Sequence, residues 1–333
     1  MKHILILTVL ILIQSCNSQV EKINGVSFVA SRDSISEKHV LPVKNIHANY
    51  ASLMPFALLK AIDSSSIYYN PNRQWFGETE AGLKQYAKHL RAQDIKIMVK
   101  PQIWVWNGEF TGTIKMTNEA DWQELENTYS KFILEFARVS QDLNAELFCI
   151  GTELELFVKH RPEYWKQLII EIKKVYKGKL TYAANWDEFK RTPFWSDLDY
   201  IGIDAYFPLT EEKTPSVEAS VKAWESHKTM IKSHSETFGK PILFTEYGYR
   251  SIDYAAKKPW EVSRVEKAIN MEAQANLTKA LFETFWSESW FAGGFVWKWF
   301  HEHETSGGLD NNRFTPQNKP AETVLKTYYH AHR

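Results

Sequence analysis

The chain has 333 residues, and its 40 basic and 40 acidic side chains cancel to a formal net charge of zero. This balance offers no positive field to a phosphate backbone, so the composition argues against a nucleic-acid-binding protein. Aromatic residues make up 14% of the chain, including 13 Trp. Flat apolar rings suit contacts with sugar faces, although we expect most of them to fill the core.

The first residues have the pattern of an export signal. A basic start, Met1-Lys-His, precedes an apolar run from Ile4 to Ile13 that is too short for a stable membrane span. The segment Ile13-Gln-Ser-Cys16 resembles a bacterial lipoprotein cleavage site, in which the cysteine becomes the lipidated first mature residue. We therefore expect residues 1–15 to be removed and Cys16 to carry a lipid.

These features predict an exported protein that touches the membrane only through its lipid, in the periplasm or on the cell surface. Without the lipid, it would be periplasmic or secreted. The second cysteine, Cys149, would then be left alone on a buried strand as a small core residue, so no disulfide framework is expected.

After the leader, short apolar strands alternate with amphipathic helical stretches. The expected strands span Val26 to Ala30, Asn45 to Leu53, Ile95 to Lys100, Glu146 to Ile150, Leu180 to Ala184, Tyr200 to Asp204, Ile242 to Thr245 and Gly294 to Trp297. The expected helices span Thr79 to Gln93, Glu119 to Gln141, Pro162 to Tyr176, Pro215 to Phe238 and Trp260 to Trp286, with shorter or broken ones in Lys38 to Asn45 and Trp186 to Asp199. Eight such units predict an α/β fold, a closed (β/α)8 TIM barrel that forms a single domain over residues 16–333.

Two glutamates stand where buried-looking strands end. Glu153 follows Glu146-Leu-Phe-Cys-Ile-Gly151 on the fourth expected strand, and Glu246 follows Lys240-Pro-Ile-Leu-Phe-Thr245 on the seventh. The carboxyl ends of barrel strands surround the active site, and these two strands lie on opposite sides of the mouth. Two carboxyl groups about 5 to 5.5 Å apart are what retaining glycoside hydrolysis requires, whereas inversion needs a wider gap.

The chain resembles glycoside hydrolase family 113 of clan A, whose known members act mainly as β-mannanases. The resemblance rests on Asn49-Tyr-Ala-Ser-Leu-Met-Pro-Phe56, Trp75-Phe-Gly-Glu-Thr79, Val99-Lys-Pro-Gln-Ile-Trp104, Ile150-Gly-Thr-Glu153, Asp199-Tyr-Ile-Gly-Ile-Asp-Ala-Tyr206 and Phe244-Thr-Glu-Tyr-Gly248. It implies that Glu153 is the general acid/base and Glu246 the nucleophile of a double displacement. Much of clan A has Asn immediately before the acid/base, whereas this chain has Thr152, so another residue must contact the sugar 2-hydroxyl.

Further candidates for substrate binding lie at other strand ends. Tyr206 can donate its hydroxyl to Glu246, and Lys100 is expected to contact either sugar hydroxyls or a carboxylate, because a buried lysine needs a partner. Trp104 is either a stacking platform or a lid on the barrel. Asn185 and Trp186 end the fifth expected strand, and the resemblance favours Trp297 over Trp299 as the floor of the sugar site.

The sequence therefore predicts a retaining hydrolase of β-1,4-mannosidic bonds in mannan, glucomannan or manno-oligosaccharides. It is expected to be a monomer that uses no cofactor and no metal, since His301-Glu-His303 lacks a third ligand. Two alternatives stay open: a retaining clan A glycosidase acting on another β-linked polysaccharide, and a non-catalytic carbohydrate-binding lipoprotein.

Overall fold

The computed structural model describes residues 21–262 and 268–333. The predicted leader, residues 1–15, and the predicted lipidation site, Cys16, lie outside the described residues and stay predictions. In the described part of the chain, no helix has the length and apolar character needed to cross a membrane.

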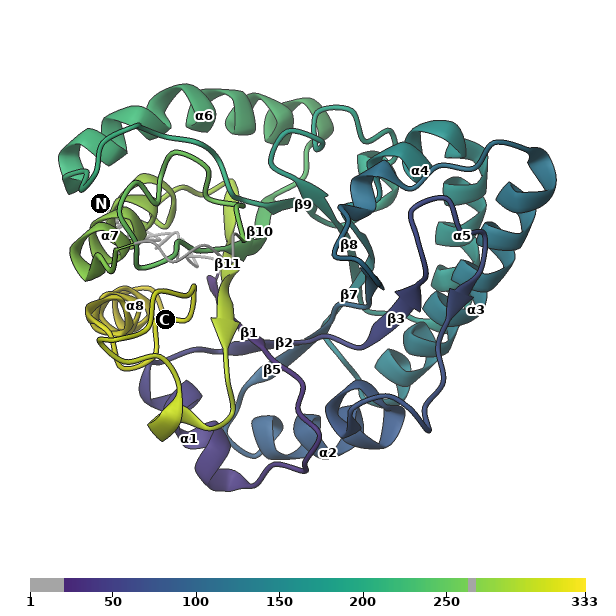
Figure 1. The fold of residues 1–333 in the computed structure, drawn as a ribbon, viewed down its shortest axis with the longest axis horizontal. Helices are drawn as coiled ribbons and strands as arrows, with labels where there is room; N and C mark the ends of the chain where they lie inside the picture. Colours follow the sequence, from purple (N-terminus) through teal and green to yellow (C-terminus); the bar gives the residue numbers. More distant parts are fainter. Residues whose placement is uncertain (1–20, 263–267) are drawn as a thin grey trace, which may run out of the picture.

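Within these two ranges, eight parallel strands close into a barrel (Figure 1). In chain order they are β1 (Ile23–Phe28), β2 (Tyr50–Leu53), β5 (Lys96–Val99), β7 (Leu147–Thr152), β8 (Lys179–Asn185), β9 (Ile201–Asp204), β10 (Ile242–Tyr247) and β11 (Phe291–Trp299). Each barrel strand pairs in parallel with the next, and β11 pairs with β1 to close the ring. The predicted (β/α)8 barrel is confirmed.

Helices surround the barrel on the outside (Figure 1). They are α1 (Glu37–Asn45), α2 (Glu80–Arg91), α3 (Glu119–Asp142), α4 (Glu155–His160), α5 (Pro162–Val175), α6 (Val217–Phe238), α7 (Met271–Phe285) and α8 (Pro320–Ala331), with 3-10 turns η1 (Phe76–Glu78), η2 (Thr111–Thr113), η3 (Trp195–Asp197) and η4 (His303–Thr305). Helix α2 shows why they form: Leu83, Tyr86 and Leu90 give it one buried face, and the Thr79 side chain caps its first turn.

The barrel interior is filled by side chains from its strands. Ile23, Met98, Leu147, Leu243 and Phe295 form one buried cluster inside it. Because the interior is packed in this way, the barrel is no pore, and ligands have access only at its mouth.

The structure corrects several predicted boundaries. The strand expected from Asn45 begins only at Tyr50, because Asn45 ends α1. Of the helix expected over Trp260 to Trp286, residues 263–267 lie outside the described residues, and α7 begins at Met271, where the Asn270 side chain accepts a hydrogen bond from the Ala273 backbone N–H and caps the first turn. Helices α4 and α8 were not predicted.

A small second sheet on the barrel rim was also not predicted. It pairs β3 (Phe56–Leu59) with β4 (Ile67–Tyr68) and β6 (Gln102–Val105). Strand β3 follows β2 after two residues, and β6 follows β5 in the same way. Each segment has four residues or fewer, so its sequence resembles a loop between barrel units rather than a strand.

The seam between β1 and β11 gives a test of barrel closure. Gly293 pairs with Ile23 at φ +118°, and a Cβ at this position would collide with the Ile23 carbonyl oxygen. We expect Gly293→Ala to lower the free energy of unfolding by about 3 kcal/mol or more, through backbone strain and overpacking. Urea unfolding measures this loss.

The matched control is Gly239→Ala at the C-terminal end of α6. Gly239 also has a positive φ, +61°, but open space surrounds its missing Cβ. It should cost only about 1 kcal/mol, from backbone strain alone. Equal losses for the two variants would contradict a role for close strand approach at the seam.

Candidate active site

Glu153 lies directly after β7, in a strained backbone conformation. The pairing of β7 with β8 is irregular between Cys149 and Thr152, and Glu153 then adopts the left-handed region with φ 51°. Its N–H donates to the Ala183 carbonyl at 2.8 Å, and its own carbonyl accepts from the Thr111 hydroxyl at 3.0 Å. Strained residues of this kind persist only where neighbours fix them, and they concentrate at functional sites.

Glu246 lies within β10 rather than after it. Ile203 pairs with Phe244 and Asp204 with Glu246, so one extra residue of β10 is accommodated between these pairs. Such a bulge redirects side chains at the end of a strand. It places the Glu246 carboxylate beside Asp204, with only 7% of the residue exposed.

Lys100 joins these two carboxylates. Its ammonium lies 3.1 and 3.2 Å from the two oxygens of Asp204 and 2.6 Å from Oε1 of Glu246. Of the two predicted kinds of partner, the carboxylate is correct, and the sugar hydroxyl is wrong because Lys100 is fully enclosed. Burial alone would lower the pKa of Lys100, but the charges of Asp204 and Glu246 reverse this and leave the pKa raised.

Two further donors reach Glu246. The Tyr206 hydroxyl donates to its Oε2 at 2.8 Å, as predicted, and the Gln102 side-chain amide donates to its Oε1 at 3.3 Å. Together with Lys100, they give the Glu246 carboxylate three hydrogen bonds. Bonds of this kind favour the ionised form of a carboxyl group.

Glu153 has the opposite environment. Among the described residues, no side chain donates a hydrogen bond to its carboxyl group, although part of the residue is open to solvent. Burial raises the pKa of Glu153 well above its usual range, and the negative charges of Asp204 and Glu246 raise it further, with Lys100 opposing.

The charge count explains this difference. Glu153, Asp204 and Glu246 would carry three negative charges around the buried ammonium of Lys100, so holding one proton reduces the repulsion among them. Asp204 has Lys100 and the Thr245 hydroxyl, at 2.7 Å, as donors. Glu153, which has none, is the residue best suited to keep the proton. The arrangement can therefore supply one acid, Glu153, and one hydrogen-bonded carboxyl group placed to act as nucleophile, Glu246.

Both glutamates line one open cleft of about 1320 Å³ at the barrel mouth. Each predicted substrate-binding residue except Lys100 also lines it: Trp104, Asn185, Trp186, Tyr206 and Trp297. A cleft of this volume exceeds the usual range for drug-sized ligands and can accept several sugar units.

The aromatic candidates differ in how they are held. Trp104 lies on β6 of the small sheet and is 55% exposed, so it is no lid packed over the barrel. Trp186 stacks on Trp260 with the ring centroids 5.3 Å apart and the planes at 19°. The Asn185 side-chain oxygen accepts a hydrogen bond from the Trp186 backbone N–H at 2.7 Å, which fixes the end of β8.

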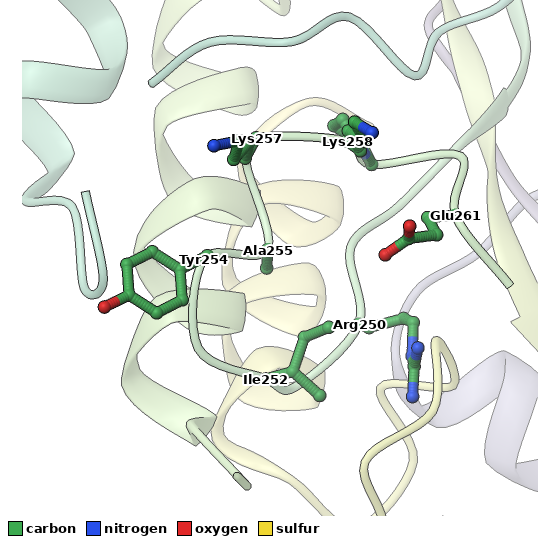
Figure 2. A pocket seen from close by; sticks show the side chains of 8 residues that line it. Arg250, Ile252, Tyr254, Ala255, Lys257, Lys258 and Glu261 are labelled. Atoms are coloured by element: carbon green, nitrogen blue, oxygen red, sulfur yellow. The ribbon is translucent and has the colours of Figure 1, made fainter. Parts of the chain in front are cut away.

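A second, smaller pocket of about 210 Å³ lies on the loop after β10. Figure 2 shows Arg250 and Glu261 on one side of it, Lys257 and Lys258 at one end, and the Tyr254 ring turned away. Glu261 lines the large cleft as well, so the two spaces are neighbours. Only the large cleft contains Glu153 and Glu246.

Sequence reasoning missed Asp204, Gln102 and Lys298 as residues of the site. Asp204 ends a buried strand in the same way as the two glutamates, and this position was the signal that could have identified it. Gln102 and Lys298 line the cleft from β6 and β11. Gln102 lies within the stretch Val99-Lys-Pro-Gln-Ile-Trp104 that carries the family resemblance, which was the signal for it, whereas no pattern in the sequence distinguishes Lys298.

The model of Glycoside Hydrolase Family 113 matches residues 30–319 of the chain. No curated protein matches the chain.

Solved structures similar to this chain include two of the same family. The GH113 β-mannanase AaManA from Alicyclobacillus acidocaldarius, in complex with ManMIm, has a TM-score of 0.82 at 23% identity, covering 94% of this chain and 98% of that one. A complex of a GH113 β-1,4-mannanase has a TM-score of 0.80 at 22% identity, covering 93% and 99%. A β-glucuronidase from Ruminococcus gnavus has a TM-score of 0.62 at 14% identity, covering 93% of this chain and 50% of that one. At these identities, the likeness shows the fold alone.

The buried ion pairs of Lys100 give a stability test. We expect Lys100→Met to lower the free energy of unfolding by about 3–5 kcal/mol, because two buried carboxylates lose their counter-ion. Without the ammonium, the pKa of Asp204, already raised by burial and by Glu246, rises further. The folded variant then holds protons that the unfolded chain releases, so its stability should fall as pH rises from about 4 through 7.

Chemical denaturation at pH 5 and at pH 8 checks this prediction. The control is Lys96→Met at the start of β5, the strand that Lys100 follows, where the lysine forms a solvent-exposed ion pair with Glu21 at 2.6 Å. Such a pair contributes about 1 kcal/mol or less. A Lys100→Met loss that is as small as the control, or that shrinks as pH rises, would contradict the ion-pair account.

Proposed function

The chain belongs to glycoside hydrolase family 113, and from this premise we propose that it cleaves β-1,4-mannosidic bonds in mannan, glucomannan or manno-oligosaccharides with retention of configuration. One observation carries the proposal: the two cleft glutamates have opposite environments. Glu246 accepts three hydrogen bonds, one of them from an ammonium, whereas Glu153 is half-buried beside other negative charges and accepts no hydrogen bond from a described side chain. This is the division between nucleophile and acid that a double displacement requires.

In the first step, a Glu246 oxygen attacks the anomeric carbon and forms an ester bond to it. The bond from that carbon to the glycosidic oxygen breaks, and the leaving oxygen takes the proton of Glu153. Lys100, Tyr206 and Gln102 orient the nucleophile, Lys100 from below the cleft surface and the other two from its lining. The products are a glycosyl-enzyme, a free sugar chain and an ionised Glu153.

In the second step, water replaces the enzyme on the same carbon. Formation of the ester removes the Glu246 charge, which is one of the causes that raise the pKa of Glu153. The pKa of Glu153 therefore falls, so Glu153 stays ionised after the first step and can accept a proton from the attacking water. The water oxygen bonds to the anomeric carbon, the ester bond breaks, and the carboxylate of Glu246 and the acid form of Glu153 are restored.

The cleft favours a neutral polysaccharide. Its lining has many acidic side chains and few basic ones: Glu78, Glu109, Glu153, Glu155, Asp187, Asp204, Glu246 and Glu261 against Arg73 and Lys298. A polyuronate would be repelled along most of this surface. The choice of mannan among neutral polymers is supported by the family and by the mannanases of similar fold.

Soluble mannan, glucomannan, a soluble cellulose derivative and galactan form the panel that tests this proposal. We expect turnover of mannan with the β-anomer appearing first by NMR. Glu153→Gln and Glu246→Gln should each lower kcat by about 10³-fold or more, because each removes a group that acts in the transition state.

Three outcomes of this panel would contradict the proposal in different ways. Turnover of galactan or cellulose alone would indicate a retaining glycosidase of another substrate class. Binding without turnover of any polymer would indicate a carbohydrate-binding protein. Appearance of the α-anomer first would indicate inversion.

Lys298 is the proposed donor to hydroxyl oxygens of the sugar beside Glu246. It lies on β11 and lines the cleft, with its ammonium 5.2 Å from the ring centroids of Trp297 and of Phe300. Burial lowers its pKa, with the charge of Glu246 opposing and that of Arg313 adding to the effect. In residues 21–262 and 268–333 we find no oxygen that accepts a hydrogen bond from it, so a sugar hydroxyl would satisfy a donor that is left over in the free protein.

We expect Lys298→Met to lower kcat/KM on the best substrate about 10- to 100-fold, which corresponds to the loss of a charged hydrogen bond. The melting temperature should stay the same or rise, because among the described residues the half-buried amine forms no hydrogen bond that the variant would lose. Lys222→Met, on the exposed face of α6, is the control and should leave both quantities unchanged. An unaltered kcat/KM for Lys298→Met would exclude the contact.

A further inference from the structure

The backbone conformation of Glu153 is unfavourable for a glutamate, so neighbouring residues must stabilise it. Its φ of 51° is unfavourable for a side chain that carries a Cβ. The next residue, Leu154, starts the turn into α4 and is 1% exposed. Its backbone N–H therefore cannot bond to water, and the direction of the Glu153 side chain depends on what fixes this N–H.

A chain of two buried hydrogen bonds fixes it. The Leu154 N–H donates to the Tyr182 hydroxyl at 2.7 Å, and that hydroxyl donates to Oε1 of Glu188 at 2.6 Å. The other oxygen of Glu188 accepts from the Asn185 backbone N–H at 3.0 Å. Tyr182 and Asn185 both belong to β8, so the chain ties the end of β7 to the end of its neighbour.

Burial of the Glu188 carboxyl group costs free energy, which indicates that the group has a role at this position. The residue is 1% exposed, and in the described part of the chain no lysine or arginine forms an ion pair with it. Burial raises its pKa to about 8, against the opposing bonds from Tyr182 and Asn185. An apolar residue would avoid this cost, so the carboxyl group is kept for the two hydrogen bonds that it accepts.

We propose that Tyr182 and Glu188 are positioning residues for the acid/base: their hydrogen bonds hold the Leu154 backbone, and thereby the left-handed turn that directs the Glu153 carboxyl group toward the glycosidic oxygen. Neither side chain lines the cleft, so neither touches substrate. The inference rests on the proposed role of Glu153 as acid/base. It adds two residues, from β8 and the loop after it, whose effect on the reaction passes entirely through Glu153.

The dependence of kcat/KM on the leaving group distinguishes this positioning role from a merely structural one. Proton donation matters for a poor leaving group, such as a sugar or phenol, and hardly at all for 2,4-dinitrophenolate. The value of kcat/KM reports the steps up to the glycosyl-enzyme, in which Glu153 acts as acid. A misdirected Glu153 should therefore lower kcat/KM for the poor leaving group only.

The test compares Tyr182→Phe with the unaltered protein on phenyl and 2,4-dinitrophenyl β-glycosides of whichever sugar the unaltered protein hydrolyses. We expect kcat/KM to fall about 10²-fold for the phenyl glycoside, the size of effect that a misplaced catalytic group produces, and less than about threefold for the dinitrophenyl glycoside. Glu188→Gln should show the same pattern to a smaller degree, because its side-chain oxygen can still accept from Tyr182. This variant keeps the test usable if Tyr182→Phe folds poorly.

Tyr129→Phe is the matched control. Tyr129 is also buried, and its hydroxyl donates to the Ile150 carbonyl at 2.8 Å, three residues before Glu153 on the same segment. It should lower kcat/KM equally, or not at all, for the two glycosides. Tyr182→Phe and Glu188→Gln behaving like this control would overturn the proposal.

Glu153→Gln, measured in parallel, separates failure of this proposal from failure of the proposed function. If it loses activity on the phenyl glycoside alone while the Tyr182 and Glu188 variants lose none selectively, the positioning role is wrong and the acid/base role stands. If Glu153→Gln itself shows no dependence on the leaving group, the acid/base role is wrong, and the positioning role falls with it.

Discussion

One ammonium group, that of Lys100, determines the electrostatics of the cleft. It is enclosed beneath the barrel mouth and contacts both Asp204 and Glu246, so it neutralises part of a cluster that would otherwise hold three uncompensated carboxylates. A buried charge is stable only when its partners are fixed around it, which ties β5, β9 and β10 together at their carboxyl ends. Lys100 thus donates to Asp204 and Glu246 and leaves Glu153 as the carboxyl group without a donor among the described side chains.

The barrel sets where the catalytic residues stand, and local irregularities of the backbone set the direction of their side chains. A regular strand would alternate its side chains between the barrel interior and the helices. The bulge that brings Glu246 beside Asp204, and the left-handed turn at Glu153, depart from this alternation at the two positions where the chemistry needs it. Hydrogen bonds from neighbouring strands stabilise both the bulge and the left-handed turn. The strained backbone is therefore local, while the residues that stabilise it come from several strands at the barrel mouth.

The sequence was sufficient for the parts of this picture that depend on periodicity. Buried strand runs such as Leu147 to Ile150 and amphipathic helices such as α2 predicted the barrel, and strand-end position singled out Glu153, Glu246, Lys100 and Tyr206. Side-chain contacts between strands far apart in the chain could not be predicted from periodicity or strand-end position. The partner of Lys100 was left open because Asp204 is 104 residues away, and Tyr182 and Glu188 resembled ordinary core and loop residues. Four-residue strands such as β3 and β6 carry too little pattern to separate them from loops.

The central claim is that Glu246 becomes covalently attached to the sugar while Glu153 transfers the protons. The most direct measurement is mass spectrometry of the protein after reaction with a 2-deoxy-2-fluoro-β-mannosyl fluoride, which forms the glycosyl-enzyme faster than water can remove it. The account predicts one added sugar per chain, located by peptide mapping on Glu246. A label on another residue, or fluoride release with no added mass while the protein turns over mannan, would contradict it.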